Sequence, residues 1–143
     1  MSLVRALKSP ERRNKIAADA VHEAEAAVAA RGGINGAAAK LGLDTINRLR
    51  PGFLQRHVHA LLPDWAEVLE PYWQESNNDQ GLAAHLVEHN AVVAKELLAV
   101  TDAYVSRASD AKAIAAYNHL RPRANERVAE QMPRIASFVE RNA

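Results

Sequence analysis

The stretch Leu82-Ala-Ala-His-Leu-Val-Glu-His-Asn-Ala-Val-Val-Ala-Lys-Glu-Leu-Leu-Ala-Val-Thr-Asp-Ala-Tyr-Val-Ser-Arg107 decides the fold of this chain. Its large apolar side chains recur every three or four residues, which is the period of an α-helix. On a helical wheel, Leu86, Val93 and Leu97 fall in one narrow sector, and flanking apolar residues widen that sector considerably. A helix with so much apolar surface is mostly surrounded by other helices. We therefore predict a long central helix over about residues 82–107.

The remaining sequence contains helix start and stop signals and no alternating strand pattern. Ser9-Pro10 is typical of a helix N-terminus, because serine caps free N–H groups and proline fits the first helical position. We expect one helix to end near Pro63, the next to bend or stop at Pro71, and Ser109 to cap a later one. The sequence thus predicts an all-α protein, a compact bundle of six to eight helices.

Composition limits the class of protein further. The chain has 143 residues, 48% of them hydrophobic, which suits a single helical domain over residues 1–143. The absence of cysteine excludes a disulfide scaffold, a thiol nucleophile and a zinc ribbon. No apolar run approaches the ~20 residues of a membrane-spanning helix, and the first residues lack the apolar core of a signal peptide. We therefore expect a cytoplasmic protein without a membrane partner.

Several short patterns occur twice along the chain. They suggest a tandem duplication of a helical unit of about 70 residues, with possible half-repeats at 1–77 and 78–143. The recurring features are Asn47-Arg-Leu-Arg-Pro51 and Asn118-His-Leu-Arg-Pro122, Lys40 and Lys112, Asp19-Ala20 and Asp102-Ala103, and Pro63 and Pro133. The alternative is chance similarity within a helical chain rich in alanine, leucine and proline.

The equivalent places in this repeat also suggest a polar cluster. Asp19 and Asp102 are expected near the middle of helices, where a buried carboxylate needs a cation or several hydrogen-bond donors. The candidate cations are Lys40, Arg50, Lys112 and Arg121, and the predicted cluster consists of Asp19, Lys40, Asp102, Lys112 and Arg121. We interpret these residues first as structural ion pairs and second as a polar binding site.

The pattern His85-Leu-Val-Glu-His89 matches H-x-x-E-H, in which two histidines one turn apart bind zinc and the glutamate acts as general base. This pattern would fit a metal-dependent hydrolase. On the helical wheel, however, the motif lies on the polar face, and zinc catalysis needs a shaped cavity with an open coordination position. The favoured interpretation is a solvated helix face, and we expect no bound metal or cofactor.

Residues 35–50 resemble a helix-turn-helix motif. Gly42 suits the turn, and Lys40, Arg48 and Arg50 are suitable contacts for DNA phosphates. Too few residues follow Gly42 for the usual turn, and Pro51 cuts the candidate recognition helix short. DNA binding is therefore an alternative, and we do not expect nucleic acid as the main partner.

Charge is distributed unevenly along the chain. Residues 57–94 contain no lysine or arginine but six acids, namely Asp64, Glu67, Glu70, Glu75, Asp79 and Glu88. This stretch is suited either to a basic partner or to packing against the basic N-terminal helix of the same chain.

The chain resembles a family of short, all-helical bacterial proteins, mainly actinobacterial, that form a domain of unknown function. The likeness covers nearly the whole chain and depends on Gly33-Ile-Asn-Gly-Ala-Ala-Ala-Lys40, Arg50-Pro-Gly-Phe53, Ala60-Leu-Leu-Pro63, Leu97-Leu-Ala-Val-Thr-Asp-Ala103, Tyr117, Leu120-Arg-Pro122 and Pro133. The resemblance implies a stand-alone cytoplasmic domain and supplies no catalytic residue, ligand or partner.

No set of residues in the sequence converges on a catalytic site that spacing alone can identify. We therefore expect a non-enzymatic cytoplasmic binding or scaffolding domain, with a second copy of the chain or another protein as its partner.

Overall fold

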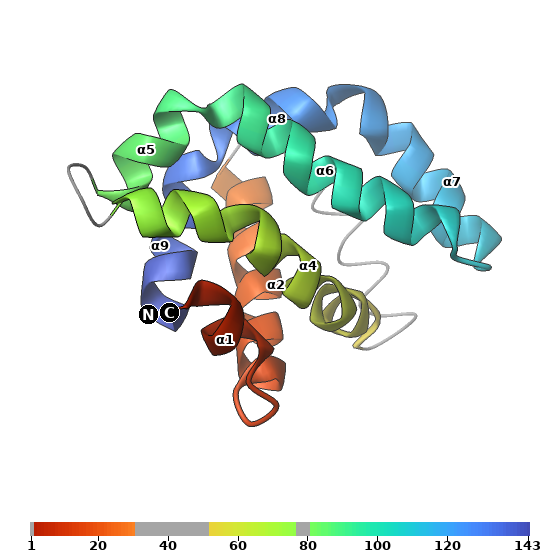
Figure 1. Ribbon diagram of the computed structural model, residues 1–143. Coiled ribbons are helices and arrows are strands. Elements are labelled where there is room, and N and C mark those ends of the chain that lie inside the picture. The colour runs from red at the N-terminus through yellow and green to blue at the C-terminus, as the bar shows by residue number, and fades with distance from the viewer. Residues whose placement is uncertain (1, 31–51, 77–80) are drawn as a thin grey trace.

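A computed structural model describes residues 2–30, 52–76 and 81–143 of the chain (Figure 1). Regular structure in these ranges is entirely helical, which confirms the all-α prediction. No helix in them is long and apolar enough to cross a membrane. The elements are α1 (Leu3–Lys8), α2 (Arg13–Ala30), α4 (Phe53–Ser76), α5 (Leu82–Glu88), α6 (Asn90–Ser106), α7 (Ala111–Leu120), the 3-10 helix η1 (Arg121–Arg123), α8 (Ala124–Glu130) and α9 (Met132–Asn142).

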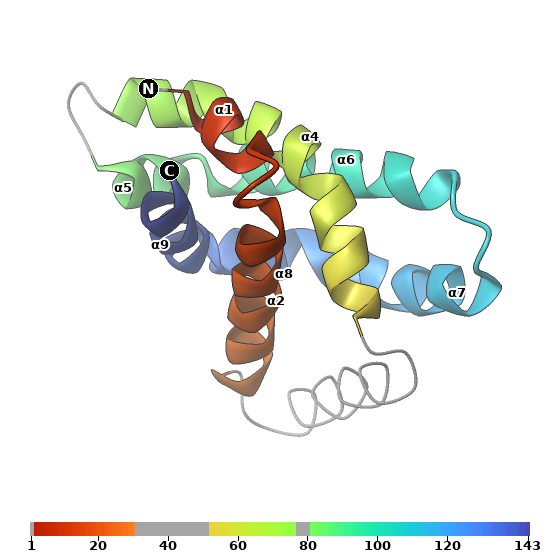
Figure 2. The same cartoon turned by 90° about the horizontal axis from the view of Figure 1, so that it is seen from below.

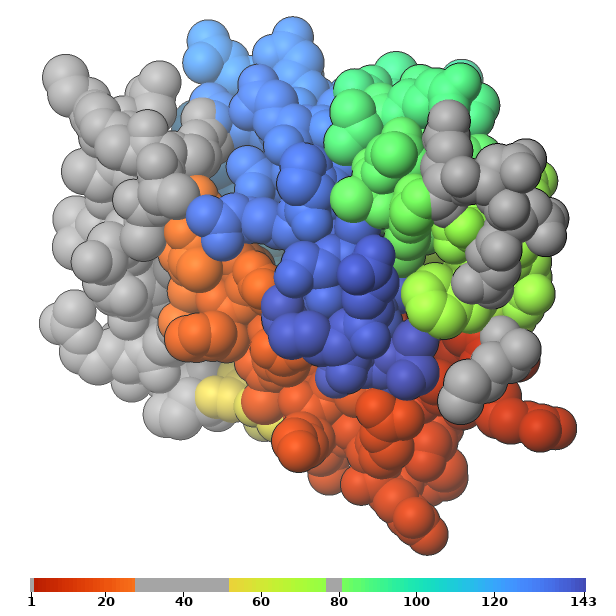
Figure 3. Space-filling model, turned by 90° about the vertical axis from the view of Figure 1, so that its left-hand side faces the viewer, coloured from red at the N-terminus to blue at the C-terminus, as the bar shows by residue number. Residues whose placement is uncertain are grey.

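The helices pack in two sets. In the first set α1 and α2 both lie against α4, and in the second α5 lies against α9 and α6 against α8. The sets meet where α4 contacts α5 and α6 and where α2 contacts α9. Figure 3 shows this last junction from one side, with α9 filling the space between α2 and α5.

Buried apolar side chains from both sets form one continuous cluster. The amphipathic spacing of the sequence explains most of its membership, because α1, α4, α5, α6 and α9 each contribute positions three or four residues apart. The fully buried members with the largest side chains are Leu3, Leu7, Ile16, Leu62, Leu86, Val93, Met132 and Val139.

The predicted long helix over 82–107 is in fact two helices that meet at His89. This residue has φ −109° and ψ 26°, and its N–H bonds to the carbonyl of His85 at 3.2 Å before α6 begins at Asn90. The break lets the two parts face different neighbours, since α5 packs on α9 while α6 packs on α8 and α4. The apolar side chains keep their helical spacing on both sides of His89, so the sequence gives no sign of the break.

The helix predicted to end near Pro63 instead continues to Ser76, with Pro63 and Pro71 inside α4. Figure 2 shows that α4 bends along its length. Proline lacks an N–H, so Pro63 cannot donate to the carbonyl of His59 one turn earlier. The guanidinium of Arg13 donates to this carbonyl instead, from Nε at 3.0 Å and from Nη2 at 2.7 Å. The first residue of α2 is therefore bound at the kink.

The N-terminal helix α1 was not predicted from the sequence. Ser9 follows its last residue rather than capping α2. At its start, Glu70 of α4 accepts hydrogen bonds from the N–H of Leu3 and the hydroxyl of Ser2, both at 2.8 Å. A carboxylate at this position satisfies a free N–H group and favours the positive end of the helix dipole. Tertiary contact therefore stabilises a helix of only six residues.

The later helix ends agree partly with the sequence signals. The cap of α7 is Asp110 and not Ser109, since its carboxylate accepts from the N–H groups of Lys112 and Ala113 at 3.1 and 3.2 Å. Pro133 lies in the first turn of α9, a position that proline favours.

Candidate functional site

The first carboxylate singled out from the sequence, Asp102 of α6, has the expected partner Arg121. The guanidinium donates from Nε to Oδ1 at 2.8 Å and from Nη2 to Oδ2 at 3.0 Å, and the Tyr117 hydroxyl also donates to Oδ1. The Arg121 hydrogen bonds lower the pKa of Asp102, partial burial opposes them, and the Tyr117 hydrogen bond adds to the lowering. Burial and the bond to Asp102 raise the pKa of Tyr117.

The second carboxylate, Asp19 of α2, has different partners. It accepts from Nδ2 of Asn142 at 2.8 Å and from Nη2 of Arg141 at 3.1 Å, and Arg141 also pairs with Glu23 at 2.9 Å. Burial raises the pKa of Asp19, but the hydrogen bonds from Asn142 and Arg141 outweigh it and the net shift is downward. These bonds join α2 to the end of α9.

The five residues of the predicted polar cluster therefore do not share one network in the described structure. Asp102 and Arg121 are paired, Asp19 is bound to α9, and Lys112 is exposed on α7. Lys40 and the whole helix-turn-helix candidate at 35–50 lie outside the described residues. The partners Tyr117, Arg141 and Asn142 were missed, because no fixed spacing links them to the carboxylates.

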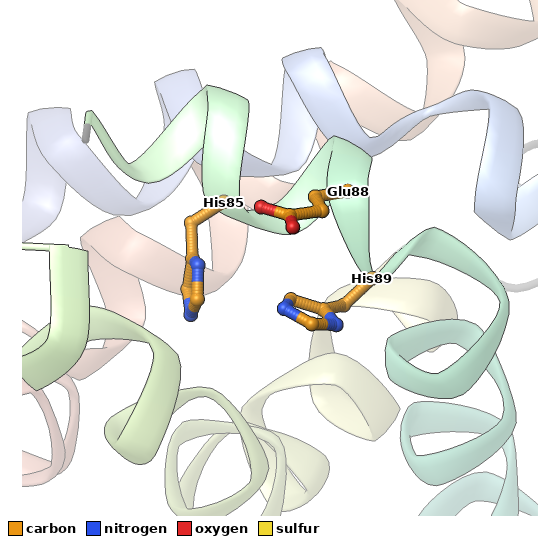
Figure 4. Close-up of side chains that lie close together, drawn as sticks. All are labelled: His85, Glu88 and His89. Atoms are coloured by element: carbon orange, nitrogen blue, oxygen red, sulfur yellow. The ribbon is translucent and has the colours of Figure 1, made fainter.

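The histidine motif forms the most concentrated group of potential ligands. One ligand atom from each of His85, Glu88 and His89 can be chosen so that all three lie within 4.8 Å of one another. Figure 4 shows the two rings and the carboxylate facing a common space beside α5. The ring centroids of the histidines are 4.9 Å apart. The two histidines are four residues apart, and His89 directly follows the last residue of α5.

Helix α4 supplies neighbours that the sequence pattern did not indicate. Glu75 Oε2 lies 2.8 Å from Nε2 of His85, and the Tyr72 ring centroid lies 5.7 Å from that of His85 and 6.1 Å from that of His89. The side chain of His85 is consequently only 15% exposed, whereas His89 is exposed. The expectation of a wholly solvated face is therefore wrong for His85, because α4 covers it.

A carboxylate of α6 binds Tyr72, the ring that lies near both histidines. The Tyr72 hydroxyl donates to Oε1 of Glu96 at 2.6 Å. Burial, together with this hydrogen bond, raises the pKa of Tyr72 to about 12. Tyr72 therefore stays protonated at neutral pH and holds α4 to α6 beside the cluster.

Other acids of the 57–94 stretch bind the basic N-terminal helix of the same chain. Lys8 pairs with Glu67 at 3.2 Å, and Glu70 caps α1. This arrangement agrees with intramolecular packing of the acidic stretch for these two residues.

A separate open depression of about 350 Å³ is lined by His57, Tyr104, Arg107, Ala108, Ser109 and Asp110. Nδ1 of His57 and the Tyr104 hydroxyl are 2.6 Å apart. Burial lowers the pKa of His57, and Arg56 adds to the effect. The imidazole is therefore neutral at pH 7 and is suited to a hydrogen bond rather than to holding an anion.

Comparison with known proteins identifies a family whose function is unknown. No curated protein matches the chain, and no solved structure matches it. A family model described as a family of unknown function, DUF6918, matches residues 3–143. This match covers nearly the whole chain, which therefore belongs to the DUF6918 family.

Proposed function

We propose that the protein is a non-enzymatic binding or scaffolding domain, built from two related helical halves, whose binding site is the cluster of His85, Glu88 and His89. The carrying observation is that, among the residues that the structure describes, this cluster is present in one half only, whereas buried positions and helix contacts recur in both.

Buried residues recur at an offset that is constant within each pair of helices but differs between the pairs. Leu62, Ala66 and Leu69 in α4 are buried, and the residues 70 positions later, Met132, Ala136 and Val139, are buried in α9. Leu3 and Leu7 of α1 correspond to Leu82 and Leu86 of α5 at an offset of 79, and Ile16 and Ala17 of α2 to Val93 and Ala94 of α6 at an offset of 77. In this last register Asp19 corresponds to Glu96, and not to Asp102 as the sequence patterns suggested. A shared burial pattern of this kind supports duplication of an ancestral unit.

The packing partners also correspond between the halves. The contact of α1 with α4 matches that of α5 with α9, and the contact of α2 with α4 matches that of α6 with α8. Pro63 and Pro133 lie at the same point of the two units, where α4 bends and where α9 begins. Matched packing together with matched burial supports duplication over chance similarity of short patterns.

The histidine cluster breaks this correspondence. In the register that aligns Leu7 with Leu86, His85 corresponds to Ala6 and Glu88 to Ser9. The first half folds with those residues, so the fold does not need imidazoles or a carboxylate at these positions. Because only one of the two proposed halves carries these polar side chains here, we infer that they serve binding and not folding.

Exposure favours binding over hydrolysis at this place. Glu88 and His89 are both exposed. A catalytic zinc needs a shaped, largely dry surround for its open coordination position, and an exposed helix end provides little of it. The cluster is better suited to hold a ligand at the surface.

The test compares the full chain with the double variant His85→Ala/His89→Ala. We expect the variant to keep its helical circular dichroism, and neither protein to hydrolyse a panel of peptide and ester substrates supplied with Zn²⁺. Turnover by the full chain that the double variant loses would identify an enzyme and refute the proposal.

A further inference from the structure

We propose that His85, Glu88 and His89 bind a divalent transition-metal ion of the zinc type, and that Glu75 positions His85 for it. This inference rests on the proposed function only in using the same site. It assigns the chemical class of the ligand.

The donor set suits such an ion. Two imidazoles and a carboxylate are typical ligands of Zn²⁺ and neighbouring divalent ions, whereas Mg²⁺ and Ca²⁺ prefer oxygen alone. Histidines at positions i and i+4 lie on one side of a helix, as His85 and His89 do up to the helix break.

The distances are close to those of a bound state. Ligand atoms about 2.1 Å from a tetrahedral ion lie about 3.4 Å from one another. The three ligand atoms of the cluster lie within 4.8 Å of one another. Glu88 and His89 are exposed. Rotation of these two side chains can therefore bring the ligand atoms to the spacing of a tetrahedral site without moving the buried residues.

The contact between Glu75 and His85 matches the usual second partner of a metal-binding histidine. Such histidines commonly donate their other ring N–H to a carboxylate, which fixes the tautomer and the ring orientation. Glu75 Oε2 lies 2.8 Å from Nε2 of His85, so Nδ1 is the atom left for the ion. The tilted Tyr72 ring, which lies near both histidines, restricts the orientation of His85 further.

The local charge also favours a cation. Residues 57–94 contain no lysine or arginine, so neither α5 nor the last two turns of α4 brings a basic group to the cluster. The nearby carboxylates are those of Glu75, Glu88 and Glu96, the last bound to Tyr72. An ion bound here would link the end of α5 to His89, the residue that separates α5 from α6.

The experiment titrates the full chain, freed of metal with a chelator, with Zn²⁺ alone by calorimetry and by competition with a chromophoric chelator. We expect one ion per chain, and at least a hundredfold weaker binding by His85→Ala/His89→Ala. Glu75→Gln should bind on the order of 10–100-fold more weakly, the usual effect of losing a partner of a metal ligand.

The matched control is His22→Ala/His119→Ala, which removes two exposed histidines from α2 and α7. It should bind Zn²⁺ like the unmodified chain. If His85→Ala/His89→Ala does not fold, His89→Ala and Glu88→Gln, both at exposed positions, replace it. Co²⁺ substitution adds a visible absorption spectrum that reports nitrogen and oxygen ligands directly.

Absence of binding by the full chain would overturn the metal inference, as would equal binding by the cluster variant and the unmodified chain. Equal losses in the control variant would show nonspecific binding to surface histidines and would overturn it too. These results differ from failure of the proposed function, which is turnover that depends on the cluster. Zinc bound at the cluster together with such turnover would support the metal site and refute the non-enzymatic role.

Discussion

Replacing Leu86 by alanine tests whether the two halves share one cooperative core. Leu86 of α5 is 0% exposed, and Leu7 of α1, which the proposed duplication pairs with it, is 1% exposed. Removing a fully buried leucine side chain costs about 2–5 kcal/mol, because transfer free energy is lost and a cavity remains. Since both residues belong to the same buried cluster, we expect Leu86→Ala and Leu7→Ala to cost similar amounts.

The assay is urea unfolding followed by two probes. Circular dichroism reports all helices, whereas tryptophan fluorescence reports α4, which carries both Trp65 and Trp73. With a slope of about 2 kcal/mol per molar urea, a loss of about 3 kcal/mol lowers the midpoint by about 1.5 M. We expect Leu86→Ala to shift both probes equally, although the tryptophans lie in the other half.

A midpoint that falls by circular dichroism but not by fluorescence would refute the shared core, because α4 would then unfold independently of α5. The control is Val92→Ala, since Val92 lies on α6 with 54% of its surface exposed. Its free energy of unfolding should change by no more than about 0.5 kcal/mol, as is usual at the surface.

Three further predictions concern single side chains. Glu70→Ala should lower the free energy of unfolding by about 1–2 kcal/mol through loss of the cap on α1, with faster amide hydrogen exchange at Leu3 and its neighbours. The lowered pKa of Asp102 means that its stabilising effect is complete above the pKa of an unfolded aspartate and disappears as pH falls through the folded value. Asp102→Asn should therefore reduce the dependence of the urea midpoint on acid pH. Because the Asp102 side chain is 41% exposed, the loss of free energy of unfolding should stay under about 1 kcal/mol. An unchanged pH profile would contradict the pairing of Asp102 with Arg121. Tyr72→Phe should remove one phenol that ionises near pH 12 from the ultraviolet absorbance titration, and loss of a phenol titrating near pH 10 instead would contradict its burial beside Glu96.

Helices that show a regular spacing of apolar residues were predicted from the sequence. Helices and helix ends that depend on contacts between distant residues were missed. The apolar spacing in α6 and α9 is visible without a structure, as is the start of α9 at Pro133. The six residues of α1 are too few to show a period, and this helix depends on Glu70 of α4. Local signals also cannot decide whether a proline ends a helix or bends it.

The candidate site shows the same division. The spacing of His85, Glu88 and His89 is a local pattern and was recognised, but its interpretation as a solvated face missed Tyr72 and Glu75. These two residues reach the histidines only because α4 returns beside α5 in the folded chain. Likewise, the pairing of Asp19 with Arg141 joins residues near opposite ends of the chain. Only tertiary structure brings such groups together.

The bond between Arg13 and the carbonyl of His59 has a consequence for how the chain can diverge. With Pro63 present, loss of Arg13 would leave this carbonyl without its two donors, and with alanine at position 63 the carbonyl would regain an intrahelical donor. Each residue thus alters the selective value of the other, although they lie 50 positions apart in sequence. Substitutions at the two sites should be non-additive, and lineages that lose the proline are free to lose the arginine.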